Sequence, residues 1–233
     1  MCYLLFKPVG AAIDPSWLDN AFDSGNCDGF GFAYVDNGKP TIRKYMSFHA
    51  FLTACESIPT HVNAVIHLRM ASTGKVCKAN AHPFAFGDLI GAHNGCLFGY
   101  GDDNKTDTED FFQREVLHSS KLITESENLG RAIGHGKMVF LDSVGNPYIL
   151  NEDKGEWFGN CWHSNQYYKN IFRGVGFYGE PETEETDAVS ALLENLYTVD
   201  QNSLPRALAR SVRNLIEETE QAYQNQNSFN NCL

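Results

Sequence analysis

Apolar positions along the first half of the chain alternate between strand-like and helix-like spacing. The opening run MCYLLF has the composition of a buried strand. Two runs rich in β-branched and aromatic residues, FGFAYVD at 30–36 and KPTIRKYM at 39–46, flank an Asn-Gly-Lys turn and predict a hairpin. The preceding stretch, 14–29, is rich in turn-forming residues.

The next segments predict one helix and two strands. Helical spacing runs through SFHAFLTACESI, residues 47–58, with Ser47 as a candidate N-cap. VNAVIHLRM at 62–70 and DLIGAHNGCLF at 88–98 have the composition of short apolar strands that end in polar residues. Strand ends are where a rigid sheet commonly presents reactive groups.

Residues 99–110 predict a loop by their Gly, Asp and Asn content, with Asp107 or Thr108 as the cap of a helix at 109–121. A second, short helix is expected at 126–136. Four strands are then expected, at 137–142, 147–152, 156–162 and 173–178. Two more helices, at 186–197 and at 203–223 with Ser203 as cap, form an expected helical extension at about 186–224, before a polar, frayed tail at 225–233.

The order of these elements predicts the fold class. Strands, helices, strands and helices follow one another in blocks, which favours an α+β fold over an alternating βαβ fold. No internal repeat or interior linker interrupts the chain, so 1–233 is expected to form a single domain. The acidic run EPETEETD at 180–187 is interpreted as a solvated connection to the terminal helices.

Charge and composition narrow the class of partner. The chain has 29 acidic and 18 basic residues, a formal net charge of -11, and no basic cluster, which argues against nucleic acid as a partner. No apolar stretch approaches the ~18–20 residues that span a bilayer, and the first residues lack the basic start of a secretion signal. We therefore expect a cytoplasmic protein without a membrane partner.

Seven cysteines are scattered along the chain without a CxxC pair. An odd, dispersed set is typical of reduced thiols and not of a disulfide framework or a zinc ribbon. Three histidines, His67, His82 and His93, follow apolar runs but form neither an HExxH pattern nor a close Cys/His quartet, so neither zinc nor another cofactor is expected. They are more simply core or loop histidines.

Cys2 is the first candidate for chemistry. Removal of Met1 would leave a thiol and a free α-amino group on one residue, a nucleophile together with a base. Their ordinary pKa values, near ~8.5 and ~7.7–8.0, allow the amine to accept the thiol proton at neutral pH. A small buried hydrophobe is the alternative interpretation of Cys2.

Three polar clusters, at 67–84, 91–99 and 105–110, supply candidates for the rest of an amide-cleaving site. The Asn94 amide and the Gly95 backbone N–H are suitable donors to an oxyanion, although Asn-Gly is also a strong turn signal. Arg69 can bind a carboxylate through two parallel bonds, and Asp107 can bind an ammonium group, although each is also suited to a surface ion pair.

Taken in order, Met1-Cys2, DGFGFAY, HLRMASTG, NAHPF, AHNG and TDTE resemble the glutaminase domain of class II glutamine amidotransferases, which are N-terminal-nucleophile hydrolases. The resemblance spans roughly residues 2–180 and is closest to stand-alone members without a fused synthase. It implies a four-layer αββα sandwich with the nucleophile at the end of a central strand. A separate synthase or acceptor protein is then the expected partner.

The resemblance also implies residue roles. Cys2 would be the nucleophile, Asn94 and Gly95 the oxyanion hole, and Arg69 and Asp107 the binding groups for the α-carboxylate and α-ammonium of glutamine. The chain departs from the family pattern at Tyr3, where glycine is common, and in RMAST, where an aromatic residue and threonine often follow the arginine. These departures bear on specificity more than on mechanism.

The leading hypothesis is a cysteine amidohydrolase that acts on glutamine or a related γ-glutamyl compound through a thioester on Cys2. A catalytically idle fold used as a binding or regulatory module is the alternative from another class. A third hypothesis keeps the chemistry but replaces the substrate with a peptide or another N-capped amide.

Overall fold

The fold was derived from a computed structural model, which describes residues 1–116 and 127–169. The chain divides into two compact units, Met1–Val175 and Gly176–Leu233, and all described residues belong to the first. Three predicted elements, the strand at 173–178 and the helices at 186–197 and 203–223, lie outside the described residues, as does the end of the helix predicted at 109–121.

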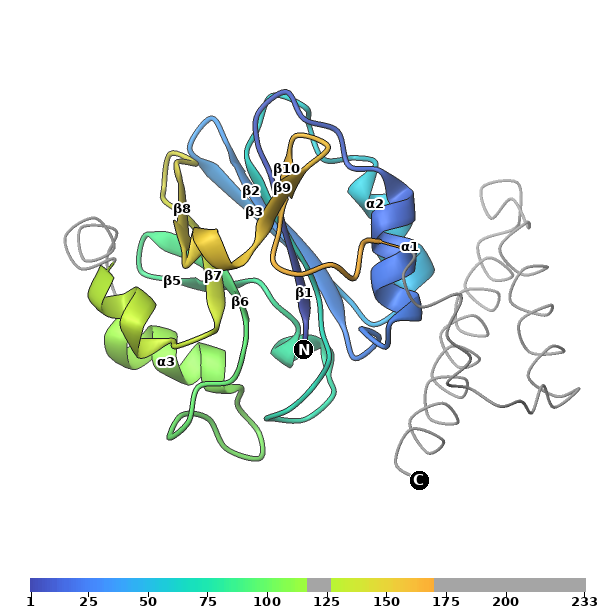
Figure 1. Ribbon diagram of the computed structural model, residues 1–233. Helices are drawn as coiled ribbons and strands as arrows, with labels where there is room; N and C mark the ends of the chain where they lie inside the picture. The colour runs from blue at the N-terminus through green and yellow to red at the C-terminus, as the bar shows by residue number, and fades with distance from the viewer. Residues whose placement is uncertain (117–126, 170–233) are drawn as a thin grey trace, which may run out of the picture. The chain divides into compact units, whose positions relative to one another are not determined.

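Two antiparallel sheets form the framework of the first unit (Figure 1). The larger sheet has the strand order β3-β2-β4-β1-β10-β9, and the smaller one has the order β5-β6-β7-β8. The strands of the larger sheet are β1 (Tyr3–Lys7), β2 (Phe30–Asp36), β3 (Lys39–Tyr45), β4 (Ala64–Leu68), β9 (Glu156–Phe158) and β10 (Cys161–His163). Those of the smaller sheet are β5 (Phe84–Phe86), β6 (Leu89–Asn94), β7 (Lys137–Leu141) and β8 (Pro147–Leu150).

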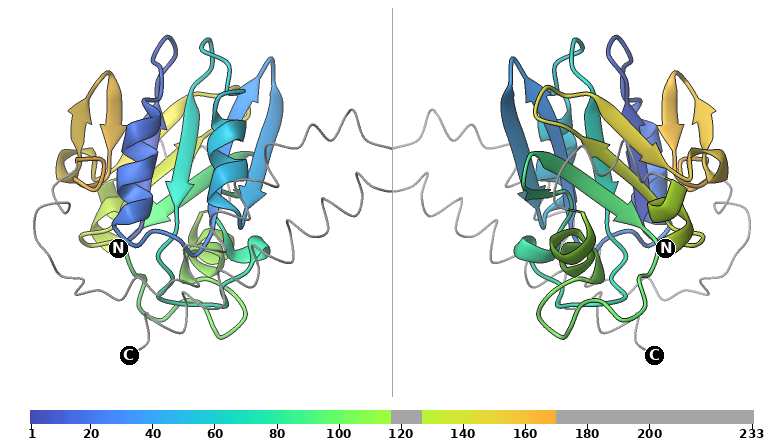
Figure 2. Two further views of the ribbon diagram at one scale, coloured as in Figure 1. Left: turned by 90° about the vertical axis from the view of Figure 1, so that its right-hand side faces the viewer. Right: turned by 90° about the vertical axis from the view of Figure 1, so that its left-hand side faces the viewer.

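The helices lie outside the sheets. They are α1 (Pro15–Asp23), α2 (Phe48–Cys55), α3 (Asp107–Glu115), a short helix at 127–132, and the 3₁₀ turns η1 (Lys78–Asn80) and η2 (Glu152–Lys154). Figure 2 shows α1 and α2 side by side across one face of the larger sheet. With antiparallel sheets and separate helices, the described part of the chain confirms the α+β prediction.

Side chains of β1 point alternately to the two faces of the larger sheet and enter two different cores. Tyr3 and Leu5 point into a core shared with α1 and α2, whereas Leu4 and Phe6 point into a second core. This second core also contains apolar residues of β6 and β7, so it lies between the two sheets. All five residues of β1 are buried, as expected for a central strand covered on both faces.

A third core covers the opposite face of the smaller sheet. Phe111 and Phe112 of α3 pack there with Met138 and Phe140 of β7. Burial of aromatic side chains of this size dominates core energetics. The three cores therefore lie on the two faces of β1 and on the face of the smaller sheet that α3 covers.

Several predicted boundaries were wrong for identifiable reasons. Residues 14–29 contain α1, whose N-terminus is capped by Asp14 accepting from the Ser16 N–H, with Pro15 in the first turn. Helix α3 begins at Asp107, and its cap is Thr106, which accepts from the Glu109 N–H at 3.1 Å, not Asp107 or Thr108. The cap at Ser47 is confirmed.

The expected strand at 156–162 is instead a hairpin, β9 and β10. Gly159 and Asn160 both have positive φ, 56° and 62°, and form its turn. Two consecutive residues of this kind make the tight turn whose twist matches paired strands. Strand β5 was not predicted, and β6 ends at Asn94, since Gly95 begins the loop that leads to α3.

Within the described ranges, no helix has the length and apolarity needed to cross a membrane.

Candidate active site

Strand register places Cys2 and Arg69 at the same end of the larger sheet. Tyr3 pairs with Leu68 in the β1–β4 ladder, and Phe30 pairs with Leu68 in the β2–β4 ladder. Cys2 and Arg69 are the residues immediately beyond that pair on β1 and β4. The chain terminus marked in Figure 1 lies at this end of β1.

The Cys2 thiol is buried against the backbone that follows Arg69. Its Sγ lies 3.4 Å from both the N and the O of Met70, and its carbonyl oxygen accepts from the Asn165 amide at 2.8 Å. Burial raises the pKa of the Cys2 thiol, whereas the Met70 backbone, the N-terminal ammonium and Arg69 act to lower it and Asp107 adds to the rise. The thiol is therefore within electrostatic reach of both proposed head-group residues.

Arg69 is only 3% exposed and anchors its own loop. Its Nη1 donates to the Lys75 carbonyl at 3.0 Å, and its Nη2 donates to the Thr73 and Gly74 carbonyls at 2.8 and 3.3 Å. A guanidinium group has five N–H donors. One N–H on Nη1 and the Nε–H have no acceptor among the described residues, so the side chain retains donors for an external anion.

The segment before α3 packs directly on this arginine loop. A Cβ added at Gly74 would lie 3.2 Å from the Thr106 N, and one added at Gly101 would lie 2.6 Å from the Asp107 N and 2.9 Å from Thr73 Cγ2. Glycine at both positions lets the two backbones approach closely. This contact brings the N-terminus of α3 next to the loop that Arg69 anchors.

Asp107 lies buried at the first turn of α3. Its Oδ2 accepts from the Leu97 N–H at 2.7 Å, and its Oδ1 accepts from the Thr108 N–H and hydroxyl at 2.7 and 3.2 Å. A carboxylate offers about four acceptor positions, of which these bonds use three. One position on Oδ2 is left for an external donor such as an ammonium group.

Asn94 connects the two sheets at the end of β6. The side chain is 1% exposed, and its Nδ2 lies 2.8 Å from the hydroxyl oxygen of Ser164, which also accepts from the Leu4 N–H at 2.9 Å. The other amide atom, Oδ1, is buried without a partner among the described residues. Asn94 is thereby fixed beside β1, two residues along the strand from Cys2.

Gly95 occupies a place where no side chain fits. An added Cβ would lie 2.6 Å from His93 Nε2 and 2.8 Å from the Gly136 Cα. Because real Cβ contacts are never this short, a larger residue would displace either the histidine ring or the neighbouring backbone. The tight packing fixes the backbone that follows Asn94.

Three buried histidines lie between this end of the two sheets. His67 contacts the His93 carbonyl oxygen at 3.1 Å, and its ring centroid lies 4.1 Å from that of His82. His93 Nδ1 lies 3.1 Å from the Thr108 hydroxyl, which in turn donates to Asp107. Burial lowers the pKa of His67 to about 3 and that of His93 to about 4, and the pKa of His82 is lowered as well, so the rings are neutral. No group of three or more metal-ligating side chains was found in the part of the chain that the structure describes.

The structure brings Cys2, Arg69 and Asp107 within electrostatic reach of one another and places Asn94, followed by Gly95, beside the strand of Cys2. Two further residues that were not predicted contact this group. Ser164 and Asn165 directly follow β10 and contact Asn94 and Cys2, respectively. We looked in the sequence for polar clusters after apolar strands and missed both residues, because the strand before them, β10, has only three residues. The signal that was available is the Ser-Asn pair at the end of the apolar run CWH.

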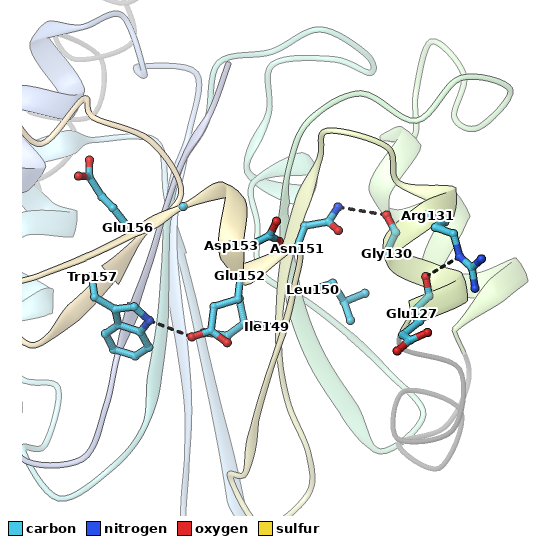
Figure 3. Close-up of a pocket in the computed structure, with 11 residues that line it drawn as sticks. Glu127, Gly130, Arg131, Ile149, Leu150, Asn151, Glu152, Asp153, Glu156 and Trp157 are labelled. Atoms are coloured by element: carbon cyan, nitrogen blue, oxygen red, sulfur yellow. Dashed lines mark hydrogen bonds between the residues drawn. The ribbon is translucent and has the colours of Figure 1, made fainter.

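A surface groove of about 930 Å³ lies elsewhere, beside β8 and β9, and does not include Cys2. Acidic side chains, Asn151 and Trp157 line it, and Figure 3 shows Trp157 donating to Glu152 and Asn151 donating to Gly130. None of the residues predicted to carry chemistry contributes to this groove. We place the candidate site at Cys2, where the reactive groups converge, and not in this groove.

Comparison with solved structures finds similarity in fold. The fold is similar to that of a glutamine phosphoribosylpyrophosphate amidotransferase from B. subtilis in complex with ADP and GMP, with a TM-score of 0.48 and 15% sequence identity. The match covers 72% of this chain and 42% of the other, so the chain spans less than half the length of that protein. No protein-family model and no curated protein matches the chain.

Proposed function

We propose that the protein is a cysteine amidohydrolase of the class II glutamine amidotransferase type, which hydrolyses the side-chain amide of glutamine or a related γ-glutamyl compound. The observation that carries the proposal is the convergence of Cys2, Arg69, Asn94 and Asp107 from separate segments at one end of the sheets. The order of cores described above supports the αββα sandwich expected of this type.

The proposed reaction begins after Met1 is removed. The free α-amino group of Cys2 takes the thiol proton, and the thiolate attacks the amide carbon of the substrate. The carbonyl oxygen gains negative charge and receives hydrogen bonds from the Asn94 amide and the Gly95 N–H. The proton passes from the α-ammonium group to the leaving nitrogen, the C–N bond breaks, and ammonia leaves a thioester on Cys2.

Water completes the cycle. The α-amino group accepts a proton from water, hydroxide adds to the thioester carbon, and the C–S bond breaks to release the γ-carboxylic acid and the thiol. Arg69 and Asp107 hold the α-carboxylate and α-ammonium groups during both steps. The ammonia is either released or supplied to a separate acceptor protein.

Burial of Cys2 makes the α-amino group important. Because burial raises the pKa of the thiol, little thiolate forms at neutral pH without a nearby base or cation. The N-terminal ammonium group lowers the pKa of the thiol even when Met1 is present. Removal of Met1 would place the α-amino group on Cys2 itself. The proposed mechanism therefore requires Cys2 as the first residue.

The test compares two preparations of the full chain, one with Cys2 first and one that retains Met1, each verified by intact mass. We expect the first to release ammonia from glutamine and the second to be inactive, because Met1 converts the amine base into an amide. Cys2→Ser should lose activity, whereas Cys77→Ser, which changes a half-buried thiol outside the proposed machinery, should not. Full activity with Met1 retained would contradict the mechanism.

A binding or regulatory module remains the alternative, and one observation favours it. Arg69 and Asp107 both have partners within the protein, the carbonyls of residues 73–75 and the N–H groups of Leu97 and Thr108. Such contacts would suffice for a structural role. Absence of ammonia release from glutamine, from α-blocked amides and from peptides by protein that starts at Cys2 would favour this alternative.

A further inference from the structure

Ser164 occupies a junction between the strand that carries Cys2 and the strand that carries Asn94. It follows β10, and the Leu5–His163 pair of the β1–β10 ladder brings it beside Leu4. Its backbone N–H donates to the Leu4 carbonyl at 2.9 Å, and the Leu4 N–H donates to its Oγ at 2.9 Å. Ser164 is fully buried, so its hydroxyl cannot exchange these partners for bulk water.

Two polar groups at this junction have no hydrogen-bond partner when the Asn94 amide donates to Ser164. The Ser164 Oγ then accepts from both Leu4 N and Asn94 Nδ2, and both of its acceptor positions are used. Its own O–H has no acceptor, and Asn94 Oδ1 has no donor, among the described residues. A buried polar atom without a hydrogen-bond partner destabilises the folded protein.

Rotation of the Asn94 amide by half a turn gives the Ser164 O–H an acceptor and Asn94 Oδ1 a donor, and it leaves the NH₂ group as the end without a partner. The two ends of an amide are nearly isosteric, so the rotation needs no other movement. Ser164 would then accept from the Leu4 N–H and donate its O–H to Asn94 Oδ1. The Asn94 NH₂ group would point to the buried place where Oδ1 now lies, with no acceptor for its hydrogens among the described residues.

We infer that Ser164 is a positioning residue that orients the Asn94 amide as a donor to the carbonyl oxygen of the substrate. The inference rests on the proposed function, in which an amide-cleaving reaction requires a donor to the carbonyl oxygen at this place. The Leu4 contact gives Ser164 a fixed position relative to the strand of Cys2. Ser164 therefore positions the Asn94 amide relative to the Cys2 thiol. The carbonyl oxygen of the substrate would be the acceptor for this NH₂ group.

A double-mutant cycle in protein that starts at Cys2 tests this inference. Asn94→Ala should lower kcat about 10²–10³-fold. Ser164→Ala should lower kcat roughly 10–100-fold with little change in KM, because a misplaced donor acts mainly in the transition state. The double variant should lose no more than Asn94→Ala alone, since Ser164 acts through that amide.

Controls separate positioning from folding. Ser164→Thr retains the hydroxyl and should recover most of kcat, and Ser57→Ala, which removes an exposed hydroxyl bonded to the Ala54 carbonyl, should leave kcat unchanged. Thermal melting and the alkylation rate of Cys2 establish that each variant is folded. If Ser164→Ala does not fold, Ser164→Cys, with similar volume and a weak S–H donor, replaces it in the cycle.

Two outcomes overturn the inference and differ from failure of the proposed function. Losses that multiply in the double variant would show that Ser164 acts independently of Asn94, and a change confined to KM would assign it to substrate binding. Wild-type protein that starts at Cys2 and releases no ammonia would overturn the proposed function and this assignment together.

Discussion

Arg69 combines two tasks at the level of a single side chain. Its guanidinium holds three carbonyls of residues 73–75, and its remaining N–H groups are available to a carboxylate. A lysine ammonium is a point charge that cannot reproduce this planar fork. The same residue is therefore expected to determine both the shape of the loop and the recognition of the amino-acid head.

Replacement of Arg69 by lysine should raise KM for glutamine about 10-fold or more, because each charge-assisted bond contributes ~1.5–3 kcal/mol and 1.4 kcal/mol corresponds to tenfold. We expect kcat and the rate of Cys2 alkylation to change much less. Steady-state ammonia release measures the first effect and mass spectrometry the second. Arg43→Lys, at an exposed position of strand β3, is the matched control and should leave KM unchanged.

Asp107→Asn should also raise KM for glutamine, because the amide retains an acceptor for the Leu97 N–H but lacks the charge that binds an ammonium group. A glutamine analogue without its α-amino group should be a poor substrate for the wild type and lose little further in the variant. Competition assays with the two substrates measure this difference. Equal losses for both substrates would show that Asp107 does not bind the α-ammonium.

At the level of elements, the close approach between β2 and the segment before β5 determines how the layers join. A Cβ at Gly31 would lie 2.2 Å from the His82 carbonyl oxygen and 2.7 Å from the Arg43 carbonyl oxygen. Both neighbours are backbone atoms, which cannot turn away as the end of a side chain can. The segment that carries His82 is thereby held against the larger sheet.

Gly31→Ala should destabilise the protein by on the order of 1–3 kcal/mol or more, the usual cost of overpacking a well-packed region. Chemical denaturation of the two proteins under the same conditions measures the difference. Gly130→Ala is the matched control, because its Cβ would meet only the end of the Asn151 side chain, at 3.1 Å, within a helix. A loss for Gly31→Ala no larger than that of the control would contradict the packing argument.

On the scale of the whole molecule, the buried histidines make stability depend on pH. Their folded pKa values, about 3 for His67 and about 4 for His93, lie well below the ~6.5 of an unfolded histidine. Between these values the unfolded chain binds protons that the folded chain does not, so the free energy of unfolding falls as pH falls. The contribution of the neutral histidines to the free energy of unfolding is fully present above pH ~6.5 and is lost progressively below it.

We expect the melting temperature to decrease from pH 7 to pH 5, and His82→Asn to reduce the decrease, because one buried group that must stay neutral has been removed. The asparagine carbonyl can still accept from the His93 N–H, as His82 Nδ1 does at 3.4 Å. Melting curves at several pH values check the prediction, and a temperature independent of pH would contradict it.

The sequence by itself determined the features that depend on neighbouring residues. Alternation and β-branched residues predict β1 and the β2–β3 hairpin, and Ser47 predicts the start of α2, because periodicity and capping act over a few positions. Helix α1 was also locally encoded by Asp14 and Pro15, although the turn-forming residues that follow obscured it.

The five candidate site residues were named from short motifs and from a family resemblance, and their roles remain predictions. What the motifs omit is the partner of each residue. Arg69 turned out to hold its own loop, and Asp107 to hold the Leu97 N–H, because the polar groups of a buried loop must find partners within the protein.

Only the tertiary structure decided which distant residues meet. Ser164 and Asn165 lie about 160 positions from the start of the chain, and they contact Leu4 and Cys2 because β10 pairs with β1 in one register. A shift of one residue would turn these side chains to the opposite face of the sheet. That register depends on the burial of whole strand faces between the layers, a property of the assembled cores that no local run of residues specifies.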